Sequence, residues 1–170
     1  MQRLAAVLAL PLVLVATSAL AQQVKTVETG KIWSAYTVPE KGGLTCYLVG
    51  SPAKSEPSSL PRSRVDAMVS HRVAEKAYYV VTFNLGYAAK KDAKAELVVD
   101  GKKYNLFVDN DAAWTASAAT DKAVTEALAH GKSATLKAAS ARGTATTDTY
   151  DLSGFGQALK AIDAVCKVKQ

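Results

Sequence analysis

Histidine is scarce in this chain, whose 170 residues include only His71 and His130. This scarcity excludes a histidine-rich metal site, because such sites need several imidazole ligands. The sequence has no glycine-rich phosphate loop, and the Ser-Gly-Phe-Gly segment at 153–156 lacks the glycine that precedes the serine of a nucleophile elbow. We therefore expect no catalytic residues, no metal and no cofactor.

Cysteine is equally rare, since Cys46 and Cys166 are the two in the chain. They do not form a Cys-x-x-Cys sequence, so a thiol–disulfide redox catalyst is not expected. A reactive thiol, half of a metal site and a disulfide are the interpretations considered, and we favour the disulfide. A bridge between positions 120 apart would stabilise the fold by roughly 5 kcal/mol in the chain-entropy model.

The N-terminus carries the features of an export signal. Arg3 is followed by an apolar stretch, residues 4–15, that is too short to span a bilayer comfortably, and Ala-Leu-Ala at 19–21 is a small-x-small cleavage sequence. We expect cleavage after Ala21. The mature chain, residues 22–170, is then a single domain without a transmembrane segment, periplasmic or secreted, in a space where disulfides form.

The chain carries a modest excess of positive charge. The net charge of +6 falls to +5 when Arg3 is removed, which keeps a domain soluble and favours an anionic envelope or host component as partner. Nucleic acid is not expected, because the chain is exported. The lysine cluster consists of Lys90, Lys91, Lys94, Lys102 and Lys103. It is either a solvated sheet edge that discourages aggregation or a docking patch.

Aromatic residues make up only 7% of the chain, so its core must rely on Val, Leu and Ala. Short alternating segments rich in Val, Thr and Tyr predict a largely β domain. We expect strands at 32–38, 44–48, 65–73, 78–85, 95–99, 104–108, 133–139 and 144–152. The proline- and serine-rich segment 51–61 predicts a surface loop. Asp100-Gly101 predicts a tight hairpin turn.

Two helices interrupt this pattern, at about 118–130 and 153–166. Thr120 is a suitable N-cap for the first helix, and Gly131 ends it. The fold class we expect is mainly β, a β-sandwich or flattened barrel with these two helices packed on it.

The second helix gives the disulfide a geometric basis. Its apolar stripe consists of Phe155, Leu159, Ile162 and Cys166. Cys46 shares a strand face with Leu44 and Leu48, so a Cys46–Cys166 bond would fasten the C-terminal helix to an N-terminal strand.

His71 and Arg72 are candidate interaction residues. His71 falls on the apolar side of its expected strand, where it is either a hydrogen-bonded core histidine or a binding or acid–base group. His130 lies in the last turn of its helix, where a partial positive charge suits the helix dipole.

Several stretches together resemble the invasion-associated locus B family of alphaproteobacterial exported proteins. They lie at 45–49, 68–72 with 74–76, 112–114 with 119–122, 142–144 with 146–150, and 152–155. These stretches span nearly all of the mature chain. The resemblance implies a compact, mostly β envelope protein, linked to host-cell invasion in some pathogenic members. It implies no catalytic residues.

The function we expect is that of an exported, non-catalytic, envelope-associated interaction protein, contributing to host-cell invasion or to envelope function. One alternative is a small-ligand-binding β protein of the periplasm, with an apolar cavity near Tyr79, Phe83 and Trp114. A second alternative is an envelope hydrolase that uses His71 with an acid that the sequence does not identify.

Overall fold

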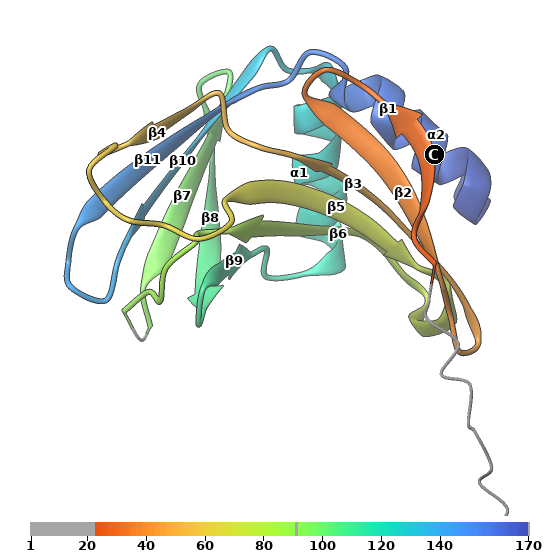
Figure 1. The fold of residues 1–170 in the computed structure, drawn as a ribbon, viewed down its shortest axis with the longest axis horizontal. Helices are drawn as coiled ribbons and strands as arrows, with labels where there is room; N and C mark the ends of the chain where they lie inside the picture. Colours follow the sequence, from red (N-terminus) through yellow and green to blue (C-terminus); the bar gives the residue numbers. More distant parts are fainter. Residues whose placement is uncertain (1–22, 91, 170) are drawn as a thin grey trace, which may run out of the picture.

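The structure is a computed structural model that describes residues 23–90 and 92–169 (Figure 1). The expected signal peptide, residues 1–21, lies outside the described residues. The strands are β1 (Lys25–Thr29), β2 (Trp33–Glu40), β3 (Gly43–Gly50), β4 (Lys54–Glu56), β5 (Asp66–Arg72), β6 (Ala77–Asn84), β7 (Lys94–Val99), β8 (Lys102–Asp109), β9 (Ala112–Trp114), β10 (Ser133–Ala139) and β11 (Ala145–Asp151). The helices are the 3-10 turn η1 (Val73–Glu75), α1 (Ala118–His130) and α2 (Phe155–Cys166).

The eleven strands form one antiparallel, strongly curved sheet (Figure 1). Their order is β1-β2-β3-β5-β6-β9-β8-β7-β10-β11-β4. The first and last strands of this order are not paired with each other, so the sheet is open rather than a closed barrel. The expected mainly β fold with two helices is confirmed. Neither helix is long and apolar enough to cross a membrane, among the residues that the structure describes.

Alternation along the strands separates a core side of the sheet from an outer face. In β2, Trp33 and Ala35 are buried in the core while Tyr36 is only half-buried on the other side. In β3, Cys46 and Leu48 alternate in the same way with Tyr47. The period of two in the sequence therefore predicts the side on which each of these residues lies.

The hairpin between β7 and β8 turns where expected. Asp100 and Gly101 have φ angles of 44° and 88°, which is the left-handed conformation that a type I′ turn needs at both central positions. Val99 and Lys102 are consequently paired directly across the ladder.

Helix α1 begins earlier than its expected cap. Ser117, rather than Thr120, is the N-cap, and its side-chain oxygen accepts a hydrogen bond from the Thr120 backbone N–H at 3.2 Å. Asp121, in the first turn of α1, accepts the Val81 backbone N–H of β6 at 2.8 Å. The helix therefore covers a part of β6 that β9 does not reach, since β9 pairs with only residues 82–84 of it.

The core is centred on aromatic side chains from distant parts of the chain. The Trp33 ring meets Phe155 of α2 edge-on at 4.8 Å and lies 6.3 Å from Tyr150 of β11. The indole N–H donates to the Asp151 carbonyl oxygen at 2.8 Å. These contacts join β2, α2 and β11. Gly50 of β3 makes room for them, because a methyl group there would lie 2.6 Å from Trp33 Cε3.

The expected surface loop at 51–61 is not entirely irregular. It contains β4, whose three residues pair with Thr147–Thr149 of β11 at the edge of the sheet. Serine and proline disfavour a strand locally, but backbone hydrogen bonds to β11 outweigh that preference.

Candidate functional site

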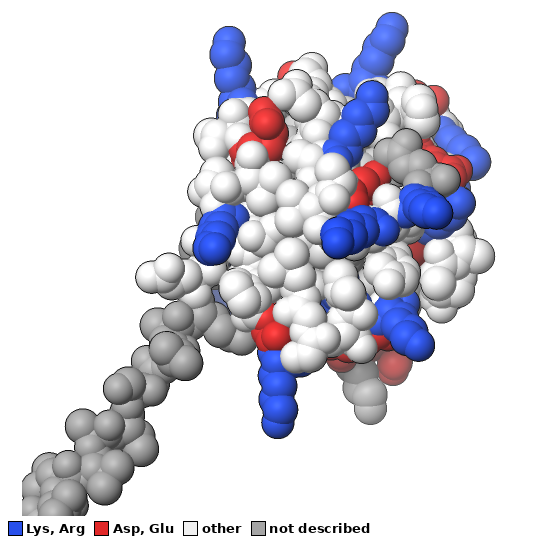
Figure 2. Space-filling view, turned by 90° about the vertical axis from the view of Figure 1, so that its right-hand side faces the viewer, with Lys and Arg blue, Asp and Glu red and all other residues white. Residues whose placement is uncertain are grey.

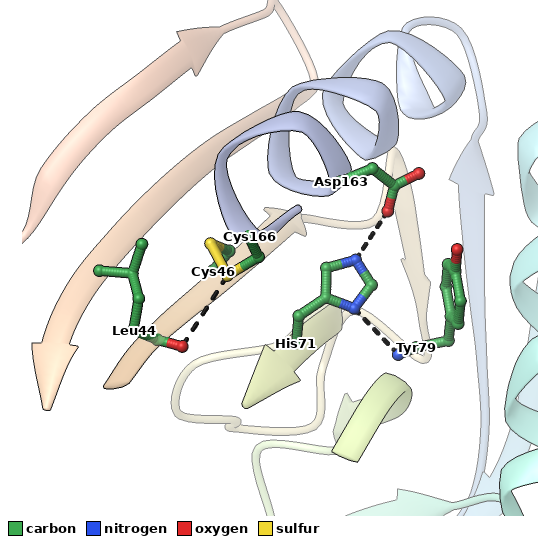
Figure 3. Close-up of a disulfide and its surroundings, with 6 residues drawn as sticks. All are labelled: Leu44, Cys46, His71, Tyr79, Asp163 and Cys166. Carbon is green, nitrogen blue, oxygen red and sulfur yellow. Dashed lines mark hydrogen bonds and ion pairs between the residues drawn. A yellow bond between two sulfur atoms is a disulfide. The ribbon is translucent and has the colours of Figure 1, made fainter. Parts of the chain in front are cut away.

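The two cysteines form a disulfide between β3 and α2 (Figure 3). Cys46 is fully buried and Cys166 nearly so. Neither is a free thiol, which removes the reactive-thiol and half-metal-site interpretations. The Leu44 carbonyl oxygen lies 3.8 Å from Cys166 Sγ, a contact rather than a hydrogen bond because a disulfide sulfur has no proton to donate.

His71 lies beside this disulfide, in a buried hydrogen-bonded chain (Figure 3). Its Nδ1 accepts the Tyr79 backbone N–H at 3.1 Å, so Nδ1 carries no proton. Its Nε2 therefore carries the ring proton and donates it to Asp163 Oδ1 on α2 at 2.7 Å. The chain links β5, β6 and α2, and it accounts for a histidine with no exposed surface.

The hydrogen bond to His71 also holds Tyr79 in an unusual backbone conformation. The φ angle of Tyr79 is 60°, which costs a bulky residue of order 1–3 kcal/mol. The carbonyl of Tyr79 accepts the Thr125 hydroxyl of α1 at 3.4 Å, so both sides of its peptide backbone are tied down. Burial raises the pKa of the Tyr79 hydroxyl, and the charges of Asp163 and Glu126 raise it further.

Tyr79 lines a small hollow between α1 and α2, of about 260 Å³. The other two residues of the expected ligand cavity do not reach it. Phe83 is fully buried against Tyr150, and Trp114 lies on the outer face, paired with Thr82. The hollow at Tyr79 is therefore lined by neither Phe83 nor Trp114, and the three residues do not share it.

A buried ion pair that the sequence analysis missed lies on the core side of β11. Arg62 donates from both terminal nitrogens to the two Asp148 oxygens, at 2.6 and 2.7 Å, and from Nε to the Leu85 carbonyl at 2.8 Å. Its guanidinium also lies 5.1 Å from the centre of the Tyr87 ring. Strand parity could have found it, because Asp148 shares the inward side with Tyr150 and a buried carboxylate needs a cation.

The lysine cluster is split between the two ends of the β7–β8 hairpin. Lys102 and Lys103 are exposed beside the turn, where Lys103 donates to Glu96 at 3.1 Å. Lys90 precedes β7, near the end where Lys94 pairs with Phe107. Five positions of β8 separate the two ends, or about 17 Å. Lys91 lies outside the described residues.

Positive charge elsewhere is also dispersed. Figure 2 shows the side of the molecule that carries α2 and β1, where Lys and Arg side chains project from a largely uncharged surface. Asp and Glu side chains lie between them at several places. This side therefore carries charges of both signs rather than one cationic patch.

Arg72 points away from His71, since consecutive strand residues face opposite sides. It lies on the outer face of the sheet, 3.5 Å from Glu75. The outer hollow, a depression of about 350 Å³, is lined by Arg72 and by Glu40, Thr45, Tyr47, Met68, Ser70 and Glu75. Of the two candidate interaction residues on β5, Arg72 is therefore accessible and His71 is not.

Aromatic rings extend from this hollow across the outer face. Tyr47 stacks on Tyr36 at 5.4 Å, with 27° between the ring planes. Across neighbouring strands, Met68 pairs with Thr82 and Thr82 pairs with Trp114. Trp114 in turn pairs with the exposed Phe107. The outer face of the first half of the sheet thus carries aromatic and apolar side chains that neither helix covers.

Comparison with known proteins identifies a family for this chain. The model of the family described as Invasion associated locus B (IalB) protein matches residues 33–163. No curated protein and no solved structure matches the chain. The matched residues extend from the core tryptophan of β2 to the carboxylate that receives the His71 hydrogen bond.

Proposed function

This chain belongs to the invasion associated locus B family, and from that premise we propose that it is an exported, non-catalytic interaction protein of the cell envelope. The proposal includes removal of residues 1–21 after Ala21 and residence in the periplasm or on the outer surface. The family description supports a role associated with invasion, and a role in the envelope itself is the other form of the proposal.

The Cys46–Cys166 disulfide supports export, because such bonds persist in oxidising compartments and are rare in the cytosol. It joins α2 to β3 across 120 positions and encloses most of the domain in one covalent loop. A cross-linked domain suits a protein that acts as a stable surface outside the cytoplasm.

The state of His71 is the observation that carries the non-catalytic part of the proposal. Both ring nitrogens are engaged, one by the Tyr79 backbone and one by Asp163, and the ring has no exposed surface. A general base needs a free nitrogen within reach of the proton that it removes. Its burial and its two hydrogen bonds support a structural role for His71 over the hydrolase alternative.

Two substitutions separate a structural from a catalytic His71. Val69 is the preceding core-side residue of β5 and is almost fully buried, so Val69→Ala is a matched control for His71→Ala. We expect any loss of function in cells to follow the loss of stability equally in both variants. A loss in His71→Ala alone, at equal amounts of folded protein, would support an enzyme.

Crosslinking in intact cells tests the interaction itself. A photoreactive group is placed at Arg72 in one variant and, as a matched control, at exposed Lys137 of β10 in another. Recovery of a defined envelope or host component from the first variant is the expected result. Absence of any captured component in both, or an unprocessed chain confined to the cytosol, would refute the proposal.

A further inference from the structure

We infer that the outer hollow binds a sugar residue of a neutral glycan chain. This inference rests on the proposed function, and it names both the surface and the chemical class of the partner. It draws on three features of the hollow: a fixed aromatic wall, a lining in which carboxylates outnumber guanidinium groups, and a buried hydroxyl without a partner among the described residues.

The aromatic wall is Tyr47. Stacking on Tyr36 holds its ring in place, and the ring is half-buried, so it presents a flat apolar surface with a polar tip. Burial raises the pKa of Tyr47, Tyr36 raises it further and Arg64 opposes them, so the hydroxyl stays protonated and able to donate. One face of a pyranose ring is covered with C–H groups, and its edge carries hydroxyls. That combination fits a ring wall with a donor at its rim.

The charged groups around the hollow select against an anionic ligand. Arg72 is already beside Glu75, and Glu40 is a further carboxylate on the rim. A phosphate or uronic acid would meet two carboxylates in the lining, while Arg72 already lies beside Glu75 and the nearby Arg64 is already paired with Asp66. A neutral polyol avoids this repulsion, because its hydroxyls donate to the carboxylates and accept from the guanidinium.

The third feature is Ser70, at the floor of the hollow. Its hydroxyl is buried and has no hydrogen-bond partner among the described residues, and the same is true of Thr82 beside Met68. A buried unsatisfied hydroxyl costs about 1–3 kcal/mol in general, so each one needs an explanation. The long, flexible Met68 side chain also lines the hollow and can move to admit a ligand hydroxyl.

Titration of the mature, oxidised protein with neutral trisaccharides tests the inference. The probes are triacetylchitotriose, maltotriose and mannotriose, each added up to about 10 mM while backbone amide resonances are recorded. We expect at least one to bind, with shifts concentrated at Tyr47, Ser70 and Arg72. Trigalacturonate, the matched anionic probe, should bind more weakly.

Three variants locate the site. Tyr47→Ala should weaken binding about tenfold, whereas Tyr78→Ala, which removes an exposed ring outside the hollow, should leave it unchanged. Ser70→Ala should weaken binding without lowering the thermal midpoint, because the native hydroxyl has no partner. A residue with a purely structural role would not alter sugar affinity in a protein of unchanged stability.

The inference is overturned if none of the neutral probes binds, if their shifts lie elsewhere, or if Tyr47→Ala binds as wild type does. Tighter binding of trigalacturonate at the hollow would also overturn it. Capture of the same cellular partner by the wild type and by Tyr47→Ala, without sugar binding, would refute the glycan and leave the proposed function standing. Sugar binding without any capture in cells would refute only the proposed function.

Discussion

Reduction of the Cys46–Cys166 bond should destabilise the domain without unfolding it. Helix α2 also buries Phe155, Leu159 and Ile162, so its docking does not depend on the disulfide alone. The bond acts mainly on the unfolded chain, in which it closes a loop spanning 120 positions. The chain-entropy relation gives a loss of about 5 kcal/mol at 25 °C when a loop of that length is opened.

Urea unfolding of the oxidised and the reduced wild-type protein measures this difference with all side chains kept. For a slope of about 2 kcal/mol per molar, a loss of about 5 kcal/mol lowers the unfolding midpoint by about 2.5 M. The slope should rise on reduction, because the opened chain exposes more surface when it unfolds. The Cys46→Ala/Cys166→Ala variant is the control, in which the reductant should change nothing.

Two results would refute this reasoning. A midpoint shift worth less than about 1 kcal/mol would mean that the bond does not restrict the unfolded chain as the loop length requires. Loss of α2 on reduction in the absence of urea would mean that the apolar stripe alone does not hold the helix on β2 and β3. Far-ultraviolet circular dichroism of the reduced protein distinguishes the second result from the first.

Three further predictions test the core. Arg62→Ala should cost about 3–5 kcal/mol of unfolding free energy, measured in urea, because it leaves the Asp148 carboxylate buried without its cation. The double variant Arg62→Met with Asp148→Leu should recover most of that loss. Equal costs in the two variants would contradict the reasoning about this ion pair. Burial is the main cause that raises the pKa of Tyr150, and the charges of Asp148 and Asp66 raise it further. A raised folded-state pKa means that the stability from neutral Tyr150 is full below about pH 10 and is lost as pH rises beyond it. Tyr150→Phe should therefore reduce the difference in unfolding free energy between pH 8 and pH 11. At pH 8 the substitution should cost no stability, because the hydroxyl has no hydrogen-bond partner among the described residues. An unchanged difference between the two pH values would contradict this. Gly50→Ala should lower the thermal midpoint by an amount worth about 1–3 kcal/mol, since the added methyl overlaps the Trp33 ring, and an unchanged midpoint would show that the ring can move.

The features predicted from the sequence are those that local patterns specify. Alternation placed Cys46 with Leu48 on one side of β3 and His71 on the apolar side of β5, and Asp100-Gly101 located the hairpin turn. The helical stripe that ends at Cys166 faces the strand of Cys46, and the disulfide follows from the two patterns together. In each case the side of the element on which a residue lies follows from the pattern of its near neighbours in the sequence.

The features that the sequence did not predict depend on distant partners. Strand β4 exists because β11 offers it backbone hydrogen bonds, and Arg62 is buried because Asp148 faces inward on that same β11. The strand order and the left-handed backbone of Tyr79 are likewise imposed from other elements. The acid beside His71 could not be identified from the sequence pattern. Asp163 directly follows Ile162 and is not a member of the apolar stripe, so only the docking of α2 on β5 brings it to His71.

The consecutive residues of β5 carry two separate roles. Val69 and His71 point into the core, where His71 ties Tyr79 to Asp163. Met68, Ser70 and Arg72 line the outer hollow on the opposite side. Because a strand alternates, a substitution at an inward position changes the framework and one at an outward position changes the surface that the framework presents. Sugar binding at the outer hollow therefore requires that changes at Ser70 and Arg72 alter binding while the fold persists, and that His71 affects binding only through the stability of that fold.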